Sequence, residues 1–177
     1  MDNNTLVLIG MPGSGKTTTA RALSLKFDME FIDTDALLVD ECRMPLGEYV
    51  KEYGREAFLD FQEKVITSFD FSGYVVATGG SVVYSEKIMK HLAGYGTIIY
   101  LQLDFEEMEK RLGSSRKLAR NKDQSLEDMY FERKPLYEKY AQLTIDCNGR
   151  DTGSIVEEIS AKLSEKAGGK EGIYAGK

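Results

Sequence analysis

The sequence predicts an α/β protein built on a doubly wound parallel sheet. Short apolar runs typical of buried strands alternate along the chain with longer segments of helical periodicity. The first run leads directly into GMPGSGKT (residues 10–17), which fits the phosphate-binding loop pattern G-x-x-x-x-G-K-[ST] and is followed by a helical segment. A fold of this class does not by itself define a function.

The phosphate-binding loop lies between an expected strand at residues 5–9 and an expected helix at 18–27. Its glycines let successive backbone N–H groups converge on an anion, and the helix N-terminus adds its positive dipole end. Lys16 supplies a point charge for the β- and γ-phosphates, and the Thr17 hydroxyl suits Mg²⁺. We therefore expect the nucleotide to contact Gly10, Pro12, Gly13, Ser14, Gly15, Lys16, Thr17 and Thr18.

A second expected strand, residues 29–32, ends at the sequence DTD (residues 33–35). Carboxylates at the carboxyl end of a parallel strand face the crevice in which such sheets bind ligands. One carboxylate of the pair Asp33 and Asp35 suits a metal shell, and the other suits an attacking hydroxyl. Alternatively, either residue caps the helix expected at 36–42.

Residues 46–69 have a helical pattern that breaks near Gly54, and Arg55 and Leu59 share a face of the second part. A third strand at 75–78 is followed by GGS (residues 79–81). Glycines at this point allow the backbone to approach a ligand closely, although a plain turn is the alternative.

A helix at 84–92, a strand at 97–103 and a helix at 104–112 precede a basic, polar segment. We interpret this segment, about residues 113–124, as a lid that closes over bound nucleotide; a solvated loop is the alternative. His91 is expected to be a solvated residue.

The remaining chain contains a helix at 125–141 with a capping start at Ser125 and Asp128 and an internal proline, Pro135, that should kink it. A short strand at 143–145 and a final helix within 151–165 complete a single domain, residues 1–165. The Gly/Lys-rich residues 166–177 are expected to be a mobile tail.

The composition of the 177 residues, 42% hydrophobic and 29% charged, is that of an ordinary globular protein. A formal net charge of −6 disfavours a general nucleic-acid or membrane-surface binder. The two cysteines, Cys42 and Cys147, follow no metal-ligand spacing. The chain begins without a basic leader and contains no apolar run long enough to span a bilayer, so we expect a cytoplasmic protein.

The assembled motifs resemble the shikimate kinases, within the nucleoside monophosphate kinase-like group of phosphate-loop enzymes. The resemblance covers residues 6 to about 163 and rests on the order and spacing of residues 10–17, FIDTD at 31–35, ATGG at 77–80, Arg116, and Arg133 with PLY at 135–137. It implies a three-layer α/β/α fold with a five-stranded parallel sheet of order 2-3-1-4-5. It also implies an enzyme that transfers the γ-phosphate of ATP to shikimate with Mg²⁺, in aromatic amino acid biosynthesis. Separately, we expect the protein to be a monomer.

On the acceptor side, the resemblance implies a role for five residues. Asp35 would bind and orient the substrate hydroxyl, and Asp33 would belong to the magnesium shell. Gly79 and Gly80 would touch the substrate, and Arg133 would bind its carboxylate.

On the nucleotide side, the resemblance implies that Arg111 and the stretch 148–150, which includes Arg150, lie near adenine. Arg116 would reach the phosphates from the lid. The residues expected to carry catalysis are therefore Lys16, Asp35 and Arg116.

The departures from the family pattern concern the acceptor. Where the family has Phe-Arg-x-x-Glu, this chain has FLDFQ (residues 58–62), so Leu59 and Gln62 replace the arginine and the glutamate. Losing an arginine that binds a carboxylate in a closed site costs on the order of 2–5 kcal/mol. Arg55, one helical turn earlier, is the obvious substitute cation.

Two further departures affect the same region. The third glycine of the family is Ser81 here, and the usual Arg-Pro of the lid is Arg116-Lys117 in a shortened lid. The sequence therefore predicts a kinase with ATP and Mg²⁺ as cofactors and a small hydroxylated metabolite as acceptor, shikimate by default. The alternatives are a different polyol or sugar acid, and a regulatory module that binds ATP without kinase activity.

Overall fold

The structure, a computed structural model, describes residues 4–112 and 124–166. Five strands form one parallel sheet with the order β2-β3-β1-β4-β5, as the resemblance implied. The strands are β1 (Thr5–Gly10), β2 (Glu30–Asp33), β3 (Tyr74–Ala77), β4 (Gly96–Gln102) and β5 (Leu143–Asp146). Each lies within two residues of its predicted position.

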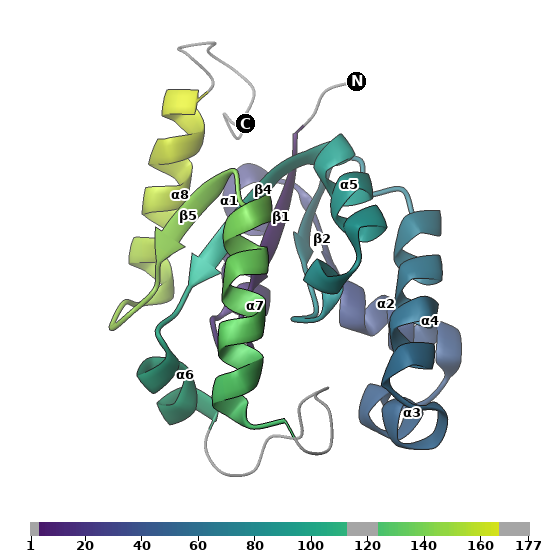
Figure 1. The fold of residues 1–177 in the computed structure, drawn as a ribbon. Helices are drawn as coiled ribbons and strands as arrows, with labels where there is room; N and C mark the ends of the chain where they lie inside the picture. Colours follow the sequence, from purple (N-terminus) through teal and green to yellow (C-terminus); the bar gives the residue numbers. More distant parts are fainter. Residues whose placement is uncertain (1–3, 113–123, 167–177) are drawn as a thin grey trace.

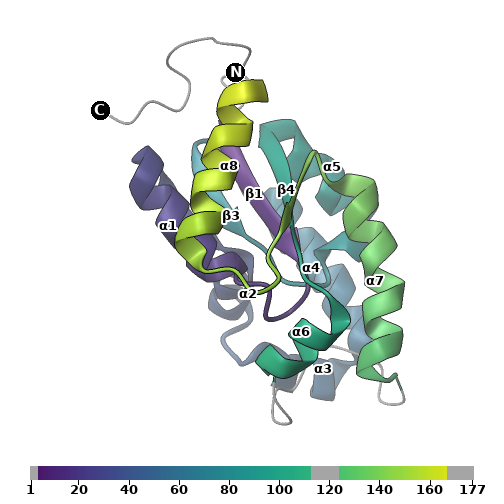
Figure 2. The ribbon, with the colours of Figure 1, turned by 90° about the vertical axis from the view of Figure 1, so that its left-hand side faces the viewer.

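Helices cover both faces of the sheet and confirm the three-layer prediction (Figure 1). Helices α1 (Lys16–Phe27) and α8 (Thr152–Lys166) pack against each other on one face, and α5 (Glu86–Tyr95) and α7 (Leu126–Tyr140) pack on the other. Figure 2 shows the sheet between these two layers. Since both faces are covered, all of β1 is buried, which explains its continuous apolar run.

The other helices surround the end of the sheet at which the strands finish. They are α2 (Thr34–Cys42), α3 (Leu46–Tyr53), α4 (Arg55–Ser68), the 3-10 turn η1 (Val82–Tyr84) and α6 (Phe105–Leu112). Helices α2, α3 and α4 contact one another and form a group beside β2 (Figure 1). The predicted break between α3 and α4 occurs at Gly54, whose φ of 89° favours glycine.

The strand register aligns the segments that carry the predicted site. Ala77 at the end of β3 pairs with Asp33 on one side and with Leu8 of β1 on the other. The phosphate-binding loop after β1, the carboxylates after β2 and the glycines after β3 therefore emerge at one edge of the sheet.

Helix α7 begins with the predicted capping box of Ser125 and Asp128, contains Pro135 as predicted, and continues to Tyr140. One local prediction was wrong. His91 is half-buried rather than solvated, because its Nε2 lies 2.9 Å from the Phe69 carbonyl oxygen and its ring packs against aromatic side chains. None of the helices in the described ranges is long and apolar enough to cross a membrane.

Three predictions fall outside the described residues. They are the lid, of which only Gln124 is described, the lid residue Arg116, and the tail after Lys166.

Candidate active site

The phosphate-binding loop adopts the backbone turns that its glycines allow. Gly13 and Gly15 have φ angles of 81° and 90°, and α1 begins directly afterwards at Lys16. The ammonium of Lys16 is largely buried and donates hydrogen bonds of 2.8 Å to the carbonyl oxygens of Gly10 and Met11. The loop therefore holds this positive charge beside the N-terminus of a helix, as anion binding requires.

Asp33 caps α2, which is the alternative role that the sequence left open, and it also contacts Thr17. Its Oδ1 accepts a hydrogen bond of 3.0 Å from the backbone N–H of Asp35 and so caps α2. Its Oδ2 accepts a hydrogen bond of 2.9 Å from the hydroxyl of Thr17. The two residues predicted to serve magnesium are thus brought together, and both offer the oxygen ligands that this ion prefers.

Gly79 leaves room for the carboxylate of Asp35. A Cβ atom built on Gly79 would lie 2.3 Å from Asp35 Oδ1, closer than real Cβ contacts. The backbone N–H of Gly79 donates a hydrogen bond of 3.0 Å to the hydroxyl of the buried Thr34. The carboxylate predicted to orient a substrate hydroxyl therefore rests against the glycine predicted to touch the substrate.

Gly80 likewise leaves room for Arg133. A Cβ atom on Gly80 would lie 2.9 Å from Arg133 Nη1 and 3.5 Å from Pro12 Cδ of the phosphate-binding loop. The hydroxyl of Tyr137 donates a hydrogen bond of 2.7 Å to the Gly80 carbonyl. Burial raises the pKa of Tyr137 to about 12, so its proton stays in place and the hydrogen bond persists at neutral pH.

Arg55 and Arg133 both lie beside the ring of Tyr84. The guanidinium carbon of Arg55 is 4.6 Å from the ring centroid, and that of Arg133 is 5.2 Å away. Leu59 is half-buried one turn after Arg55. Sequence reasoning missed Tyr84, because no motif includes it and nothing local marks the end of η1 as a meeting point of two helices.

The two neutral departures, Gln62 and Ser81, contact each other. Ser81 Oγ donates a hydrogen bond of 3.1 Å to Gln62 Oε1, and both side chains are buried. Gln62 Nε2 is buried without a hydrogen-bond partner in the part of the chain that the structure describes. Two positions at which the sequence departs from the family pattern thus form one neutral, hydrogen-bonded pair.

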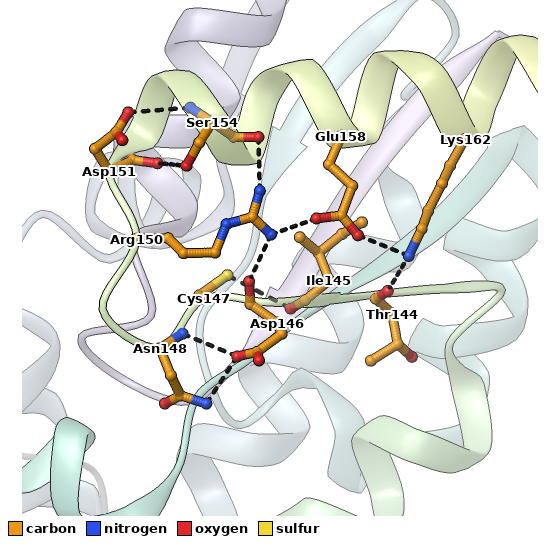
Figure 3. A network of polar contacts seen from close by, with 10 residues as sticks. All are labelled: Thr144, Ile145, Asp146, Cys147, Asn148, Arg150, Asp151, Ser154, Glu158 and Lys162. Atoms are coloured by element: carbon orange, nitrogen blue, oxygen red, sulfur yellow. Dashed lines mark hydrogen bonds and ion pairs between the residues drawn. The ribbon is translucent and has the colours of Figure 1, made fainter.

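The two arginines predicted near adenine differ in their surroundings. Arg111 donates hydrogen bonds to the carbonyl oxygens of Gly13 (3.5 Å) and Cys147 (3.0 Å), so it lies against the phosphate-binding loop. Figure 3 shows that Arg150 instead belongs to a network with Glu158 and the carbonyl oxygens of Asp146 and Ser154. Its guanidinium links the end of β5 to α8.

The parallel sheet and the glycine-containing loop between β1 and α1 define a protein of the phosphate-binding loop class. The family model for shikimate kinase matches residues 12–164, which is most of the chain. The chain belongs to the shikimate kinase family.

Relatives and solved structures agree with this assignment. The chain is 32% identical to a shikimate kinase of Rhodococcus jostii, over 90% of this chain and 97% of that one, and 30% identical to one of Enterococcus faecalis, over 90% and 98%. A shikimate kinase from Acinetobacter baumannii, solved in complex with shikimate, superposes with a TM-score of 0.80 at 25% identity, covering 95% of both chains. A gluconokinase from Sinorhizobium meliloti shares the fold, with a TM-score of 0.59 at 19% identity over 95% and 97%.

Proposed function

We propose that this family member transfers the γ-phosphate of ATP to a hydroxyl of shikimate in the cytoplasm, as a monomer. The observation that carries the proposal is the arrangement around Gly79 and Gly80. Asp35 lies against the first glycine, and Arg133 lies against the second, next to Pro12 of the phosphate-binding loop. A carboxylate for a hydroxyl and a guanidinium for a carboxylate suit a hydroxy acid such as shikimate, which the A. baumannii structure contains.

On the nucleotide side, Lys16 and the loop amides would bind the β- and γ-phosphate oxygens. The buried hydroxyl of Ser14 has no hydrogen-bond partner among the described residues, and a phosphate oxygen is a suitable acceptor for it. Arg111, held against Gly13, would lie near the nucleoside.

The metal would be magnesium, held through Thr17 and Asp33. Their hydroxyl and carboxylate already lie 2.9 Å apart and are hard oxygen donors, so the residues fit the ion. Bound magnesium would neutralise charge on the β- and γ-phosphates. Asp33 keeps the Thr17 side chain oriented through its hydrogen bond.

On the acceptor side, Asp35 would orient the attacking hydroxyl and accept its proton. Phosphoryl transfer passes through a loose transition state, so catalysis depends mainly on positioning and on charge stabilisation. Arg133 would hold the acceptor through its carboxylate. The family resemblance adds Arg116, which would stabilise charge on the transferred group.

A different sugar acid or polyol is the second candidate acceptor. The observation that favours it is the neutral Ser81–Gln62 contact, together with the apolar Leu59. In the family pattern, position 59 carries an arginine and position 62 a glutamate. A regulatory module without kinase activity is disfavoured, because a site that only binds ATP has no need of Asp35 against Gly79.

ADP release from magnesium-ATP, with and without a high shikimate concentration, tests the proposal. We would compare the wild type with Leu59→Arg/Gln62→Glu, and use Lys16→Met to define the background. Saturable shikimate-dependent turnover in the wild type, absent in Lys16→Met, would support the proposal. Turnover that appears only in the double variant would mean that the kinase machinery is intact and the natural acceptor is another compound.

Magnesium-ATP binding without ADP release, across shikimate, gluconate and neutral polyols, would instead favour the regulatory module. Wild-type turnover in the Lys16→Met protein would contradict the assignment of the phosphate-binding loop.

A further inference from the structure

The turn that follows β3, residues 79–81, is held by side chains from three different helices. Each residue of the turn makes a hydrogen bond with one of these side chains, which are at most 1% exposed: Thr34 of α2, Gln62 of α4 and Tyr137 of α7. Little solvent competes for hydrogen bonds at such buried positions. The three contacts therefore restrict the turn from three sides.

Thr34 connects this turn to the helix that carries the carboxylate proposed to orient the acceptor. Its hydroxyl accepts a hydrogen bond of 3.0 Å from the backbone N–H of Gly79, which is buried. Thr34 directly precedes Asp35, and a Cβ atom on Gly79 would lie 2.3 Å from Asp35 Oδ1. Because a buried N–H group requires a partner, the Thr34 hydroxyl fixes the glycine relative to the start of α2 and thus to the carboxylate.

Tyr137 connects the same turn to the helix that carries Arg133. It follows Arg133 by one helical turn, so both side chains leave the same face of α7. The Tyr137 hydroxyl donates a hydrogen bond of 2.7 Å to the carbonyl oxygen of Gly80, and a Cβ atom on Gly80 would lie 2.9 Å from Arg133 Nη1. The tyrosine therefore holds the backbone against which the arginine lies.

Gln62 holds the turn from α4 at a cost in stability. Its Oε1 accepts a hydrogen bond of 3.1 Å from Ser81 Oγ, but its Nε2 is buried with no hydrogen-bond partner among the described residues. A buried donor without a partner destabilises the folded state, and an apolar side chain of similar size would avoid that loss. The glutamine is therefore explained better by what it holds in place than by its contribution to stability.

We propose that Thr34, Gln62 and Tyr137 are positioning residues, which fix the turn at residues 79–81 before an acceptor binds. The turn sets where the carboxylate and the guanidinium that lie against it can be. A turn that is ordered in advance spares the acceptor the cost of ordering it. The inference rests on the proposed kinase function and identifies residues that preorganise its acceptor site without touching the acceptor.

The first test measures amide hydrogen exchange of residues 79–81 in the protein without ligands. Thr34→Val removes the hydroxyl but keeps the shape of the side chain, and it should accelerate exchange in the turn at least about tenfold. Tyr137→Phe, which removes only a hydroxyl, should have the same effect. Thr34→Ser keeps the hydroxyl and should stay within about threefold of the wild type. The matched control is Thr67→Val, which should match the wild type because the Thr67 hydroxyl bonds only to carbonyl oxygens of its own helix in the described structure.

A double variant, Ser81→Ala/Gln62→Met, separates positioning from stability. It removes both partners of one hydrogen bond together with the unpartnered Nε2, so its melting temperature should equal or exceed that of the wild type. Exchange in the turn should nevertheless be faster, and kcat/KM for the acceptor should fall at least about tenfold because the site is less well ordered. A purely structural role for Gln62 would instead lower the melting temperature and leave kcat/KM unchanged.

The inference is overturned if Thr34→Val, Tyr137→Phe or the double variant keeps wild-type exchange in the turn. It is also overturned if exchange becomes faster while kcat/KM for the acceptor stays at the wild-type value. Unchanged shikimate turnover in these variants would therefore contradict the inference and leave the proposed function standing.

Failure of the proposed function gives a different result, namely no shikimate turnover in the wild type. If the wild type phosphorylates gluconate instead, the same comparison of kcat/KM is made with gluconate. If it phosphorylates neither, the amide exchange alone decides whether the three side chains hold the turn.

Discussion

At the residue scale, Gly79 and Gly80 determine where Asp35 and Arg133, the two charged residues of the proposed acceptor site, can lie. A Cβ atom added at Gly79 would meet the carboxylate oxygen Oδ1 of Asp35, which belongs to a flexible side chain. A Cβ atom added at Gly80 would meet the guanidinium of the buried Arg133. An added methyl group should therefore move a functional side chain before it disturbs the backbone.

We predict that Gly79→Ala reduces kcat roughly 100-fold and changes the melting temperature little, because the Asp35 carboxylate moves by about 1 Å while the backbone stays in place. Steady-state kinetics and thermal unfolding of the same preparation check this. The control is Gly94→Ala in α5, where nothing lies within 4 Å of the added atom, and wild-type kinetics are expected. A large loss of stability with normal kcat in Gly79→Ala would contradict the prediction.

At the element scale, Glu158 belongs to a network of hydrogen bonds and ion pairs that connects α8 to the end of the sheet. Its carboxylate accepts a hydrogen bond from Arg150, and its Oε1 lies 2.8 Å from Lys162 Nζ (Figure 3). Lys162 in turn donates a hydrogen bond of 3.0 Å to the carbonyl oxygen of Thr144 in β5. The hydrogen bonds from Lys162 and Arg150 hold the pKa of Glu158 below its usual range.

A pKa that is lower in the folded than in the unfolded protein stabilises the fold above the unfolded value, and this stabilisation is lost as the pH falls through the folded value. We therefore predict that Glu158→Gln lowers the melting temperature at pH 7 by about 2–4 °C, for a loss of about 1 kcal/mol from a partly exposed network. The difference should shrink as the pH falls below about 4.

Thermal unfolding between pH 3 and 7 measures this effect, with the exposed Glu165→Gln, also in α8, as the matched control. A Glu158→Gln deficit that stays constant down to pH 3 would show that the carboxylate's charge is not its cause.

Helices, strands and their boundaries could be predicted where they depend on residues that are close together in the sequence. The apolar run of β1, the glycine at position 54 and the Ser125–Asp128 capping box each depend on a few neighbouring residues, and all three were confirmed. His91 was misjudged because its burial depends on Phe69 and Phe71, which precede α5 and pack back against it. Sequence periodicity within one helix does not contain that contact.

At the scale of the whole molecule, the site consists of segments that the parallel sheet brings to one edge. Asp33, Asp35 and Gly79 could be predicted together, since each lies at or just after the end of a strand and parallel strands finish at the same edge. The position of Tyr84 beside Arg55 and Arg133 could not be predicted, because it requires α4 and α7, which are far apart in the sequence, to pack on the same turn. The Ser81–Gln62 contact was likewise visible in the sequence only as two separate departures.

The same arrangement makes nucleotide binding a property of the whole fold. The phosphate-binding loop joins β1 to α1, Asp33 ends β2, and Arg111 connects α6 to that loop, so a nucleotide bound there would contact several elements. A ligand that binds only the folded state stabilises it by about 2.7 kcal/mol at 100 times its Kd. For a chain of this length we predict that magnesium-ADP at that concentration raises the melting temperature by about 5–10 °C.

Removal of magnesium with EDTA should abolish most of this increase, because the phosphates would then lose the ion that Thr17 and Asp33 are expected to hold. Thr17→Ala should reduce the magnesium-dependent part of the increase in melting temperature. Thr67→Ala, whose hydroxyl bonds only to carbonyl oxygens of its own helix in the described structure, should retain it. An equal shift with magnesium and with EDTA in the wild type would mean that the nucleotide binds without the ion, and the role of Thr17 and Asp33 would then be limited to capping α2 and orienting the loop.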